Sequence, residues 1–388
     1  MRSHLSPAGT GEGDCKLRAS SAATPVPRRI PTATPADLRS GGLLRALLAF
    51  RDSDKLGPAE FEVGHADLPG DRLRLNSVFV ILNPASCGGR THRVERRLGE
   101  EMERRKISFR LLRTEEAGHA EELAREAASS ADRLLVVGGD GTLHEVANGL
   151  LTSGSGRELP PIAILPMGTG NDFHRMVGTG SGVDQALELV ERGRPTSFDL
   201  GLARWGGEER YFVNLLGVGI DVEVLRIRKS LGRLPGLLQY LTALGVALVR
   251  FDPLPFQVEL EPDGGETREL LTGRILISAV TVGPSIGGGF MLCPDATPDD
   301  GFLDLCHLGS MGPMAIARNL PRVLRGTHGE AKQIRLRRLR QARFSTPNGE
   351  PFAFEMDGEL VSVDARTIDI SVQPKQLPVL VPSGDRKA

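Results

Sequence analysis

The sequence has few cysteines and no long apolar run. Its 388 residues contain four cysteines, scattered and without a Cys-x-x-Cys pair, so neither a disulfide framework nor a zinc site is predicted. The longest apolar stretch, residues 237–249, is shorter than the roughly 20 residues that a membrane span needs. These absences predict a soluble protein of a reducing, cytoplasmic compartment, without a transmembrane segment.

The chain also lacks an excess of either charge. It has 48 lysines and arginines against 49 aspartates and glutamates, which argues against a general nucleic-acid-binding protein. Residues 1–40 are rich in Ser, Thr, Ala, Pro and Gly without periodicity, which predicts a disordered leader. That segment lacks the apolar core of a signal peptide. A linker with one short helix, from Leu43 to Phe50, is expected over residues 41–76.

The first chemical signal is a glycine turn after an apolar run. Residues 134–137 lead directly into Gly138-Gly139-Asp140-Gly141-Thr142, and apolar residues then recur at helical spacing. Glycine amides can approach an anion closely, and a helix N-terminus favours negative charge. The turn therefore suits phosphate, with Asp140 placed to hold Mg²⁺ or to orient a nucleotide. Thr142 and Glu145 have capping-box spacing, and an ordinary strand-to-helix turn is the alternative.

Two more predicted strands end in loops of the same kind. Residues 78–82 precede Asn83-Pro84-Ala85-Ser86-Cys87-Gly88-Gly89-Arg90, and residues 162–165 precede Pro166-Met167-Gly168-Thr169-Gly170-Asn171-Asp172-Phe173. In an open α/β sheet, ligands bind beyond the carboxyl ends of the strands, so the three loops are expected to converge on one crevice. None of them contains a Walker A sequence or a Gly-x-Gly-x-x-Gly fingerprint after a strand.

In this order, Asn-Pro-x-Ser, Gly-Gly-Asp-Gly-Thr-x-x-Glu and Pro-x-Gly-Thr-x-Asn-Asp-Phe resemble the catalytic domain of diacylglycerol kinases. That family includes soluble bacterial diacylglycerol kinases, sphingosine kinases and ceramide kinases, and the resemblance runs from about Ser77 to Pro382. It implies transfer of the γ-phosphoryl group of ATP, with Mg²⁺, to the hydroxyl of a long-chain lipid. Diacylglycerol is the first candidate acceptor and a sphingoid base or ceramide the second. A catalytically silent lipid-binding protein is an alternative of another class.

The order of elements predicts two domains. Residues 77–195 alternate strands with helices, which indicates an α/β domain with a parallel sheet, similar to NAD kinase and phosphofructokinase. Residues 196–374 predict a mostly antiparallel β-sandwich, helical only at Gly236 to Arg250 and Met314 to Arg325; the run from Tyr211 to Val224 predicts one strand. The tail, residues 375–388, is expected to return to the first domain. The active site is expected in the cleft between the domains.

The resemblance also implies a set of nucleotide-binding residues. They comprise the three loops and one threonine, namely Asn83, Pro84, Ala85, Ser86, Cys87, Thr114, Gly138, Gly139, Asp140, Gly141, Thr142, Glu145, Gly168, Thr169, Asn171 and Asp172. Asp140 also matches a catalytic base of the sphingosine-kinase branch. A helix cap is an equally good interpretation of Thr114. Cys87 stands where the family usually has glycine, and its Cβ disfavours a positive φ.

The second domain contributes two acidic motifs. Asp357-Gly358-Glu359 matches the family's Asp-Gly-Glu, and Glu359 is predicted to be the general base. Asp357 would support it or touch Mg²⁺, and the reverse assignment stays open. Residues 294–304 resemble the family's Pro-x-Ala-x-x-x-Asp-Gly-x-Leu-Asp loop, which implies a structural Mg²⁺ held by Asp300 and the carbonyls of Thr297 and Phe302. A surface acidic turn is the alternative.

One apolar stretch marks the lipid side. Residues 237–248 carry an apolar helical stripe and follow a basic segment that includes Arg226, Arg228, Lys229 and Arg233. An apolar stripe with a basic flank fits docking on an anionic membrane, and a helix packed on a sheet explains the stripe equally well. A peripheral enzyme at the inner membrane face is expected, with a lipid as partner, no nucleic acid, and a homodimer left open.

Overall fold

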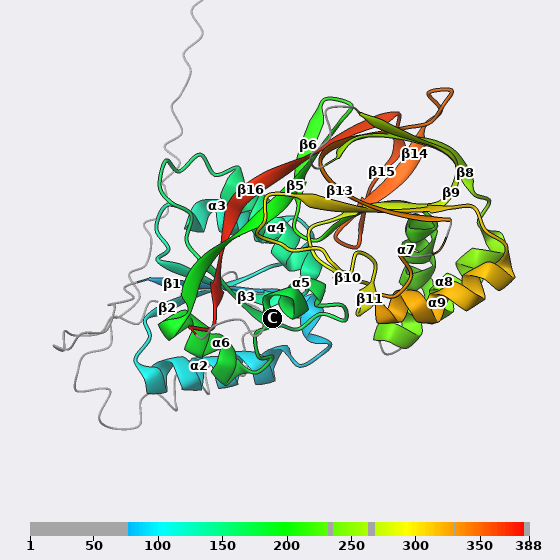
Figure 1. The fold of residues 1–388 in the computed structure, drawn as a ribbon. Helices are drawn as coiled ribbons and strands as arrows, with labels where there is room; N and C mark the ends of the chain where they lie inside the picture. The colour runs from blue at the N-terminus through cyan, green and yellow to red at the C-terminus, as the bar shows by residue number, and fades with distance from the viewer. Residues whose placement is uncertain (1–76, 232–235, 263–267, 330, 332, 384–388) are drawn as a thin grey trace, which may run out of the picture. The chain divides into compact units, whose positions relative to one another are not determined.

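The computed structural model describes residues 77–231, 236–262, 268–329, 331 and 333–383 (Figure 1). These residues belong to one of the two units into which the chain divides, Pro58–Ala388. The predicted leader and linker, residues 1–76, lie outside the described residues.

Four parallel strands form the sheet of the N-terminal half. They are β1 (Val78–Leu82), β2 (Phe109–Arg113), β3 (Arg133–Gly138) and β4 (Ile162–Pro166), in the order β2-β1-β3-β4. Every residue of β1 and β3 is buried because helices cover both faces of the sheet. One face carries α3 (His119–Ala127), α4 (Asp140–Leu151) and α5 (Asp172–Val177), and the other carries α2 (Thr91–Arg105) and α6 (Val183–Arg192). The predicted α/β domain is confirmed.

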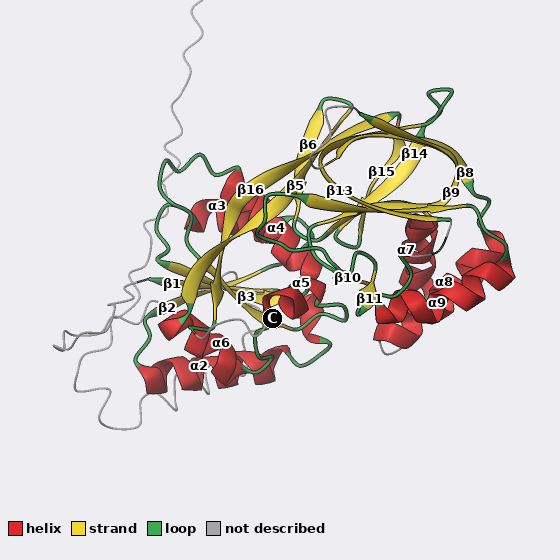
Figure 2. Cartoon of the chain, viewed as in Figure 1, coloured by secondary structure: helices red, strands yellow, loops and turns green. Residues whose placement is uncertain are grey.

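The second half consists mainly of antiparallel strands. They are β5 (Arg194–Trp205), β6 (Glu208–Phe212), β7 (Leu215–Gly219), β8 (Leu254–Pro262), β9 (Glu269–Thr281), β12 (Leu303–Gly309), β13 (Ile334–Ser345), β14 (Phe352–Met356) and β15 (Glu359–Ala365), with the small hairpin β10 (Ser285–Ile286) and β11 (Phe290–Met291). The larger strands enclose one apolar core. A second core lies between β9, β12 and three helices: α7 (Ile220–Ser230), α8 (Gly236–Arg250) and α9 (Pro313–Arg325) (Figure 2).

One long strand joins the two halves. β16 (Thr367–Val381) pairs antiparallel with β13 and β5, and at Val379 it pairs parallel with Ile162 of β4. The described residues thereby form a continuous sheet of 14 strands (Figure 1). Of the tail expected to return to the N-terminal half, residues 375–381 lie in this strand and residues 384–388 lie outside the described residues. The exact domain boundaries stay a prediction.

The run from Tyr211 to Val224 is not one strand, and that prediction is wrong. β7 ends at Gly219, where φ is +109° and a Cβ would lie 2.5 Å from the carbonyl oxygen of Leu276. Only glycine fits this turn, and α7 starts at the next residue. α7 is therefore a helix that the sequence analysis missed, as it missed the strands β5, β6 and β15.

The capping-box prediction is also wrong. α4 begins at Asp140, with Gly139 at the N-cap and no side-chain cap. The hydroxyl of Thr142 accepts a hydrogen bond from the amide of Asn83 (2.9 Å), and Glu145 accepts one from the backbone N–H of Ala120 (3.1 Å). These side chains tie α4 to neighbouring segments because its own first turn faces the cavity described below.

Close packing of α3 on α4 depends on Gly149. A Cβ at this position would overlap the carbonyl oxygen of Glu121 and approach the Cβ of Ala124 to 3.0 Å. Gly149→Ala is expected to lower the free energy of unfolding by about 1–3 kcal/mol through overpacking, although alanine is the better helix former by about 1 kcal/mol. Chemical denaturation measures the change.

Gly245 on α8 offers the matched control, because a Cβ there would meet no atom within 4 Å. Gly245→Ala is expected to raise the free energy of unfolding by about 0.5–1 kcal/mol. Equal changes in the two variants would contradict this account of the α3–α4 contact.

Candidate active site

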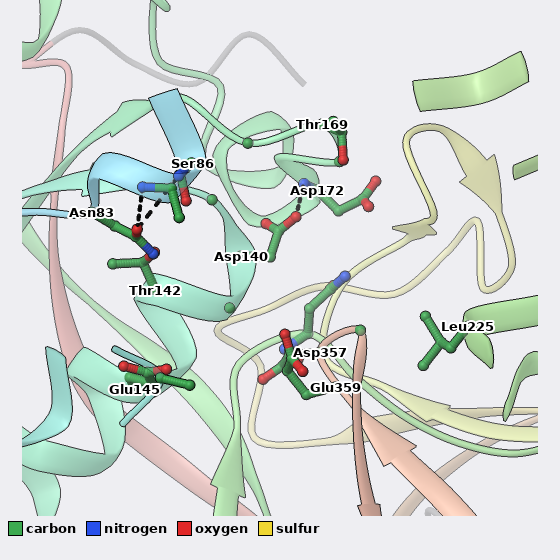
Figure 3. A pocket seen from close by; sticks show the side chains of 18 of the residues that line it. Asn83, Ser86, Asp140, Thr142, Glu145, Thr169, Asp172, Leu225, Asp357 and Glu359 are labelled. Atoms are coloured by element: carbon green, nitrogen blue, oxygen red, sulfur yellow. Dashed lines mark hydrogen bonds between the residues drawn. The ribbon is translucent and has the colours of Figure 1, made fainter. Parts of the chain in front are cut away.

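A cavity of about 610 Å³ lies at the carboxyl ends of β1 to β4 and is lined by both halves of the chain. Its N-terminal wall consists of the loops that follow the four strands. Its opposite wall comes from β7, α7, α8, β10, β14 and the turn at residues 357–359 (Figure 3). The expected cleft between the halves is therefore present.

Most of the residues predicted for the site line this cavity: Asn83, Pro84, Ala85, Ser86, Thr114, Gly139, Asp140, Gly141, Thr142, Glu145, Gly168, Thr169, Asp172, Asp357 and Glu359. Cys87, Gly138 and Asn171 belong to the same loops but are not part of its lining. Asp300, Thr297 and Phe302 lie elsewhere. Thr114 does not cap α3, because that helix begins at His119 with Gly118 as its N-cap.

Asn83 organises the first loop of the wall. Its side-chain oxygen accepts hydrogen bonds from the N–H groups of Ala85 (2.9 Å) and Ser86 (3.4 Å) in the 3₁₀ turn η3 (Pro84–Cys87). The side chain of Cys87 is buried behind this turn, where burial raises its thiol pKa. Gly88 and Gly89 take the positive φ values, +57° and +81°, so the cysteine does not disturb the loop.

The second and third loops meet through their backbones. A Cβ at Gly168 would lie 2.6 Å from the Cα of Gly139, so neither position leaves room for a side chain. Asn171, at φ +54°, braces the loop by hydrogen bonds to the N–H (3.0 Å) and carbonyl (2.8 Å) of Gly168. The result is a wall of backbone at the start of α4, which suits the phosphates of a nucleotide.

Two carboxylates stand together beside this wall. Asp140 accepts a hydrogen bond from the backbone N–H of Asp172 at 3.2 Å (Figure 3) and another from that of Phe173 at 3.2 Å. The pKa of Asp140 is raised to about 6, mainly by burial and to a smaller extent by the negative charge of Asp172. The carboxylate of Asp172 itself accepts from the N–H of Gly288 (2.9 Å) and from Arg175 (3.0 Å). Paired carboxylate oxygens are the ligands that Mg²⁺ prefers.

Asp357 is buried with all of its acceptor positions in use. One oxygen accepts from the N–H groups of Asn214 (2.8 Å) and Leu215 (2.9 Å), and the other from the N–H of Val213 (2.8 Å) and from Nδ1 of His144 (2.7 Å). Arg210 donates to Nε2 of His144 (2.7 Å), which places the imidazole proton on Nδ1. Asp357 therefore has no lone pair left for a substrate.

Glu359 differs from Asp357 in its exposure and in its hydrogen bonding, the two properties that decide whether a carboxylate can act as a base. It is exposed to the cavity, and no described residue donates a hydrogen bond to its carboxylate. Its Oε1 lies 3.5 Å from the point that a Cβ of Gly141 would occupy. The carboxylate thus stands over the first turn of α4, beside the loop that contains Asp140.

The predicted structural metal loop lies outside the cavity. Asp300 accepts from the N–H of Phe302 (3.1 Å) and forms an ion pair with Arg338. Asp199 ties this loop to β16 by accepting from the N–H groups of Gly301 (2.6 Å) and Lys375 (2.8 Å). Within the described part of the chain, no cluster of three or more His, Cys, Asp or Glu side chains is arranged to hold a metal ion.

Comparison with known proteins identifies the family. Residues 77–203 match the diacylglycerol kinase catalytic domain, and residues 214–381 match the YegS C-terminal NAD kinase beta sandwich-like domain. The chain is 30% identical over 250 residues to a diacylglycerol kinase of Bacillus subtilis, covering 63% of this chain and 76% of that protein. The chain belongs to the diacylglycerol kinase family of lipid kinases.

A further relative and a solved structure are also similar to the chain. A diacylglycerol kinase of Mycobacterium tuberculosis is 30% identical over 263 residues, which cover 67% of this chain and 80% of that protein. A crystal structure of a diacylglycerol kinase from Bacillus anthracis superposes with a TM-score of 0.59 at 22% identity, over 80% of this chain and 99% of that one; it shows the same fold. The predicted family and enzyme class are confirmed.

Sequence reasoning missed several residues of the lipid kinase's site. His144 and Arg210 hold Asp357 from behind, and Asp221, Arg228, Tyr240 and Glu355 line the cavity. Glu355 had one available signal: it is a lone acid in the otherwise apolar strand β14, and a buried acid needs an explanation. The others are brought in by long-range contacts that local spacing does not reveal.

The predicted apolar stripe of α8 packs inward where it is described. Leu241, Leu244, Ala247 and Leu248 contact the second core, so packing on the protein explains them; Arg233 and the side chains of Leu237 and Leu238 lie outside the described residues. In the part of the chain that the structure describes, no helix combines the length and the apolar character needed to cross a bilayer.

Proposed function

We propose that this lipid kinase transfers the γ-phosphoryl group of ATP, bound with Mg²⁺, to the hydroxyl of a long-chain lipid. The observation that carries the proposal is the free carboxylate of Glu359, which extends from the C-terminal half of the chain to the first turn of α4, beside Asp140 and the bare backbone wall. The names of the relatives suggest diacylglycerol as the first acceptor to test, which would give phosphatidic acid.

The N-terminal wall would bind the nucleotide. The backbone N–H groups at the start of α4 offer donors to the phosphates, and the helix dipole favours their negative charge. Side chains of Asn83, Ser86, Thr114 and Thr169 line the same wall and can contact the rest of the nucleotide. The wall therefore supplies binding and orientation, which are the main requirements of phosphoryl transfer.

Asp140 and Asp172 fit a divalent cation in this wall. Their mutual repulsion contributes to the raised pKa of Asp140, and a cation between them would relieve it. When bound, Mg²⁺ neutralises phosphate charge. A second Mg²⁺ is proposed at Asp300 with the carbonyls of Thr297 and Phe302. Burial raises the pKa of Asp300, and the carboxylates of Asp199 and Asp299 add to the shift although Arg338 opposes it, which again fits a cation.

Glu359 would act as the general base. It takes the proton from the acceptor hydroxyl while the oxygen forms its bond to the γ-phosphorus and the bond from that phosphorus to the ADP oxygen breaks. Asp357 would keep the turn at residues 357–359 in place through its bonds to residues 213–215 and His144. The lipid would be presented from a membrane surface, with the enzyme acting peripherally at the inner face.

A direct test uses purified full-length protein, labelled ATP and detergent micelles that carry diacylglycerol, monoacylglycerol, ceramide or sphingosine separately. Transfer of label to a lipid that requires both ATP and Mg²⁺ is the expected result. Absence of transfer to every lipid, and to NAD as a further acceptor, would overturn the proposal; stoichiometric lipid binding in that case would favour the non-catalytic lipid-binding alternative.

A further inference from the structure

The solvent-facing side of α9 carries three arginines and one large apolar side chain. Met314, Arg318, Arg322 and Arg325 lie at positions i, i+4, i+8 and i+11 of the helix, which share one face, and all four are exposed, Met314 by 84%. The helix contains no acidic residue, although the whole chain has 48 lysines and arginines against 49 aspartates and glutamates. These four side chains, the basic face of α9, therefore form a local excess of positive charge.

The other side of α9 is held by the protein. Ile316, Leu320, Val323 and Leu324 pack against the second core. This packing fixes the rotation of the helix about its axis, because the apolar residues occupy the side that faces the core. The basic face is therefore presented to solvent as a fixed surface.

The three arginines of the basic face lack acidic partners. None of them forms an ion pair with a residue that the structure describes, and Arg322 donates to the side-chain oxygen of Asn319 on the same helix at 3.5 Å. The helix dipole favours arginines in the last turn, here Arg322 and Arg325, but it does not account for Arg318 in the middle of the helix. The positive charge is thus available to an anionic partner outside the described chain.

The C-terminal end of α9 is attached to the wall of the cavity. At Gly326, which ends the helix, a Cβ would lie 2.9 Å from the Cβ of Pro294, and Nε2 of His328 donates to the carbonyl oxygen of Leu292 at 3.0 Å. Both contacted residues directly follow the hairpin β10–β11, and α9 contacts β11 (Figure 1). Residues 286–287 of the same hairpin line the cavity. A surface that binds α9 is therefore connected to the cavity through one hairpin.

We propose that the basic face of α9 binds the anionic surface of a phospholipid bilayer and so holds the cavity at the membrane that contains the acceptor lipid. The arginines would pair with the phosphate groups of anionic lipids, and Met314 would enter the boundary between head groups and acyl chains. The inference rests on the proposed function, to which it adds the surface of contact. That surface is not the predicted stripe of α8, whose described apolar residues pack inward.

A nucleic acid would also offer phosphates to three arginines, but Met314 favours a bilayer. A phosphate backbone binds basic and polar side chains and presents no apolar layer, whereas a bilayer surface presents both anionic groups and hydrocarbon. The acceptor of the proposed reaction also resides in a bilayer. Charge and apolar character together therefore point to a lipid surface.

The first test measures binding of the full-length protein to sedimenting vesicles of equal parts phosphatidylglycerol and phosphatidylcholine, without ATP. Arg318→Gln/Arg322→Gln/Arg325→Gln keeps exposed side chains of similar helix propensity. It is expected to lower the partition coefficient by about 30-fold to 100-fold, because each basic side chain near an anionic surface adds several-fold to binding. The difference should disappear on pure phosphatidylcholine and shrink at high salt. No loss of binding in this variant would overturn the proposal.

The matched control removes the same charge elsewhere. Arg192→Gln/Arg194→Gln/Arg204→Gln changes three exposed arginines of α6 and β5. Its partition coefficient should stay within about 3-fold of wild type. An equal loss in the two triple variants would show that only the net charge of the protein matters, and it would overturn the assignment to α9.

Insertion at the start of the helix is tested with Met314→Trp. Vesicles of the same composition with brominated acyl chains quench a tryptophan that reaches the hydrocarbon, and the chain's single natural tryptophan, Trp205, gives the background in wild type. Quenching is expected for Met314→Trp and not for Val363→Trp, which alters a residue of β15 that is 58% exposed. Absence of quenching at position 314, or equal quenching at both positions, would overturn the proposal.

Binding and transfer separate this inference from the proposed function. Vesicle binding that depends on the three arginines, without any transfer from ATP, would overturn the proposed function and support the membrane contact. Transfer from ATP with unchanged vesicle binding by the α9 variant would do the reverse. If the variant lost affinity for a DNA duplex but not for the vesicles, the basic face would be assigned to nucleic acid and the proposal overturned.

Discussion

Replacing Asp140 by asparagine is expected to abolish phosphoryl transfer and, at neutral pH, to stabilise the folded protein. The activity falls because the variant loses the carboxylate beside the nucleotide wall. The stability rises because burial and the charge of Asp172 raise the pKa of Asp140 from 3.8 to about 6. Ionising Asp140 in the folded state is therefore unfavourable, and this cost is absent in the variant.

The sign of the pH dependence follows from the raised pKa. Below about pH 4 Asp140 is protonated in both the folded and the unfolded state, so its ionisation does not lower the free energy of unfolding. As the pH rises from about 4 to about 6, the unfolded chain releases the proton first, so stability is lost across that window. A shift of this size corresponds to about 2–3 kcal/mol, and the weakened hydrogen bonds to residues 172 and 173 leave a net gain of about 1–2 kcal/mol.

Chemical denaturation of wild type and Asp140→Asn at pH 4 and pH 7.5 measures this difference. The variant is expected to be the more stable protein only at pH 7.5, and Mg²⁺-ATP is expected to stabilise wild type more than the variant. Asp364→Asn, at an exposed position of β15, is the control. It should change neither the activity nor the pH dependence of the free energy of unfolding. If the free energies of unfolding of wild type and Asp140→Asn differ by the same amount at both pH values, the raised pKa assigned to Asp140 would be contradicted.

Asp357→Ala is expected to cause the largest loss of stability among the site variants. Its carboxylate accepts four hydrogen bonds, from three backbone N–H groups and from His144, and alanine would leave all four donors buried without a partner. Unpaired buried donors each cost about 1–3 kcal/mol, with partial relaxation reducing the sum. The free energy of unfolding should fall by about 3–5 kcal/mol, and activity should fall with it.

The matched control for Asp357 is Asp369→Asn, which breaks an exposed ion pair with Arg343. Exposed pairs contribute about 0–1 kcal/mol, so this variant should remain close to wild type in a denaturant titration. The stability of Asp357→Asn should fall between those of Asp357→Ala and Asp369→Asn. Its amide N–H₂ would face at least one of the groups that now donate to the carboxylate. An Asp357→Ala protein as stable as wild type would show that these hydrogen bonds do not hold the two halves of the cavity together.

The parts of this enzyme that local sequence determines were predictable. Three strands that end in glycine-rich loops indicate a parallel sheet with a ligand site at its carboxyl edge, and the structure shows such loops lining one cavity. The helix Gly236–Arg250 also follows from apolar spacing alone. Such features depend on neighbours within one or two turns, which a single sequence displays.

Features that depend on distant partners were not predictable. Glu145 looks like the end of a capping box but binds the start of α3, because α3 lies close enough to compete for it. Asp357 and Glu359 are two residues apart and equivalent in the sequence, yet only the contacts of Asp357 with residues 213–215 and His144 distinguish them. Asp221 and Glu355 line the same cavity from segments more than a hundred residues apart, which no local pattern records.

The central claim is that Glu359 takes the proton of the lipid hydroxyl beside the backbone wall that binds ATP. The most direct measurement is the single-turnover rate of label transfer from ATP to the best lipid acceptor, for wild type, Glu359→Gln and the control Asp364→Asn, together with the affinity of each protein for ATP. The account predicts that Glu359→Gln lowers the rate by about 10²–10⁴-fold while its ATP affinity and its stability stay within about 3-fold and about 0.5 kcal/mol of wild type. A Glu359→Gln enzyme that keeps more than about a tenth of the wild-type rate would contradict it.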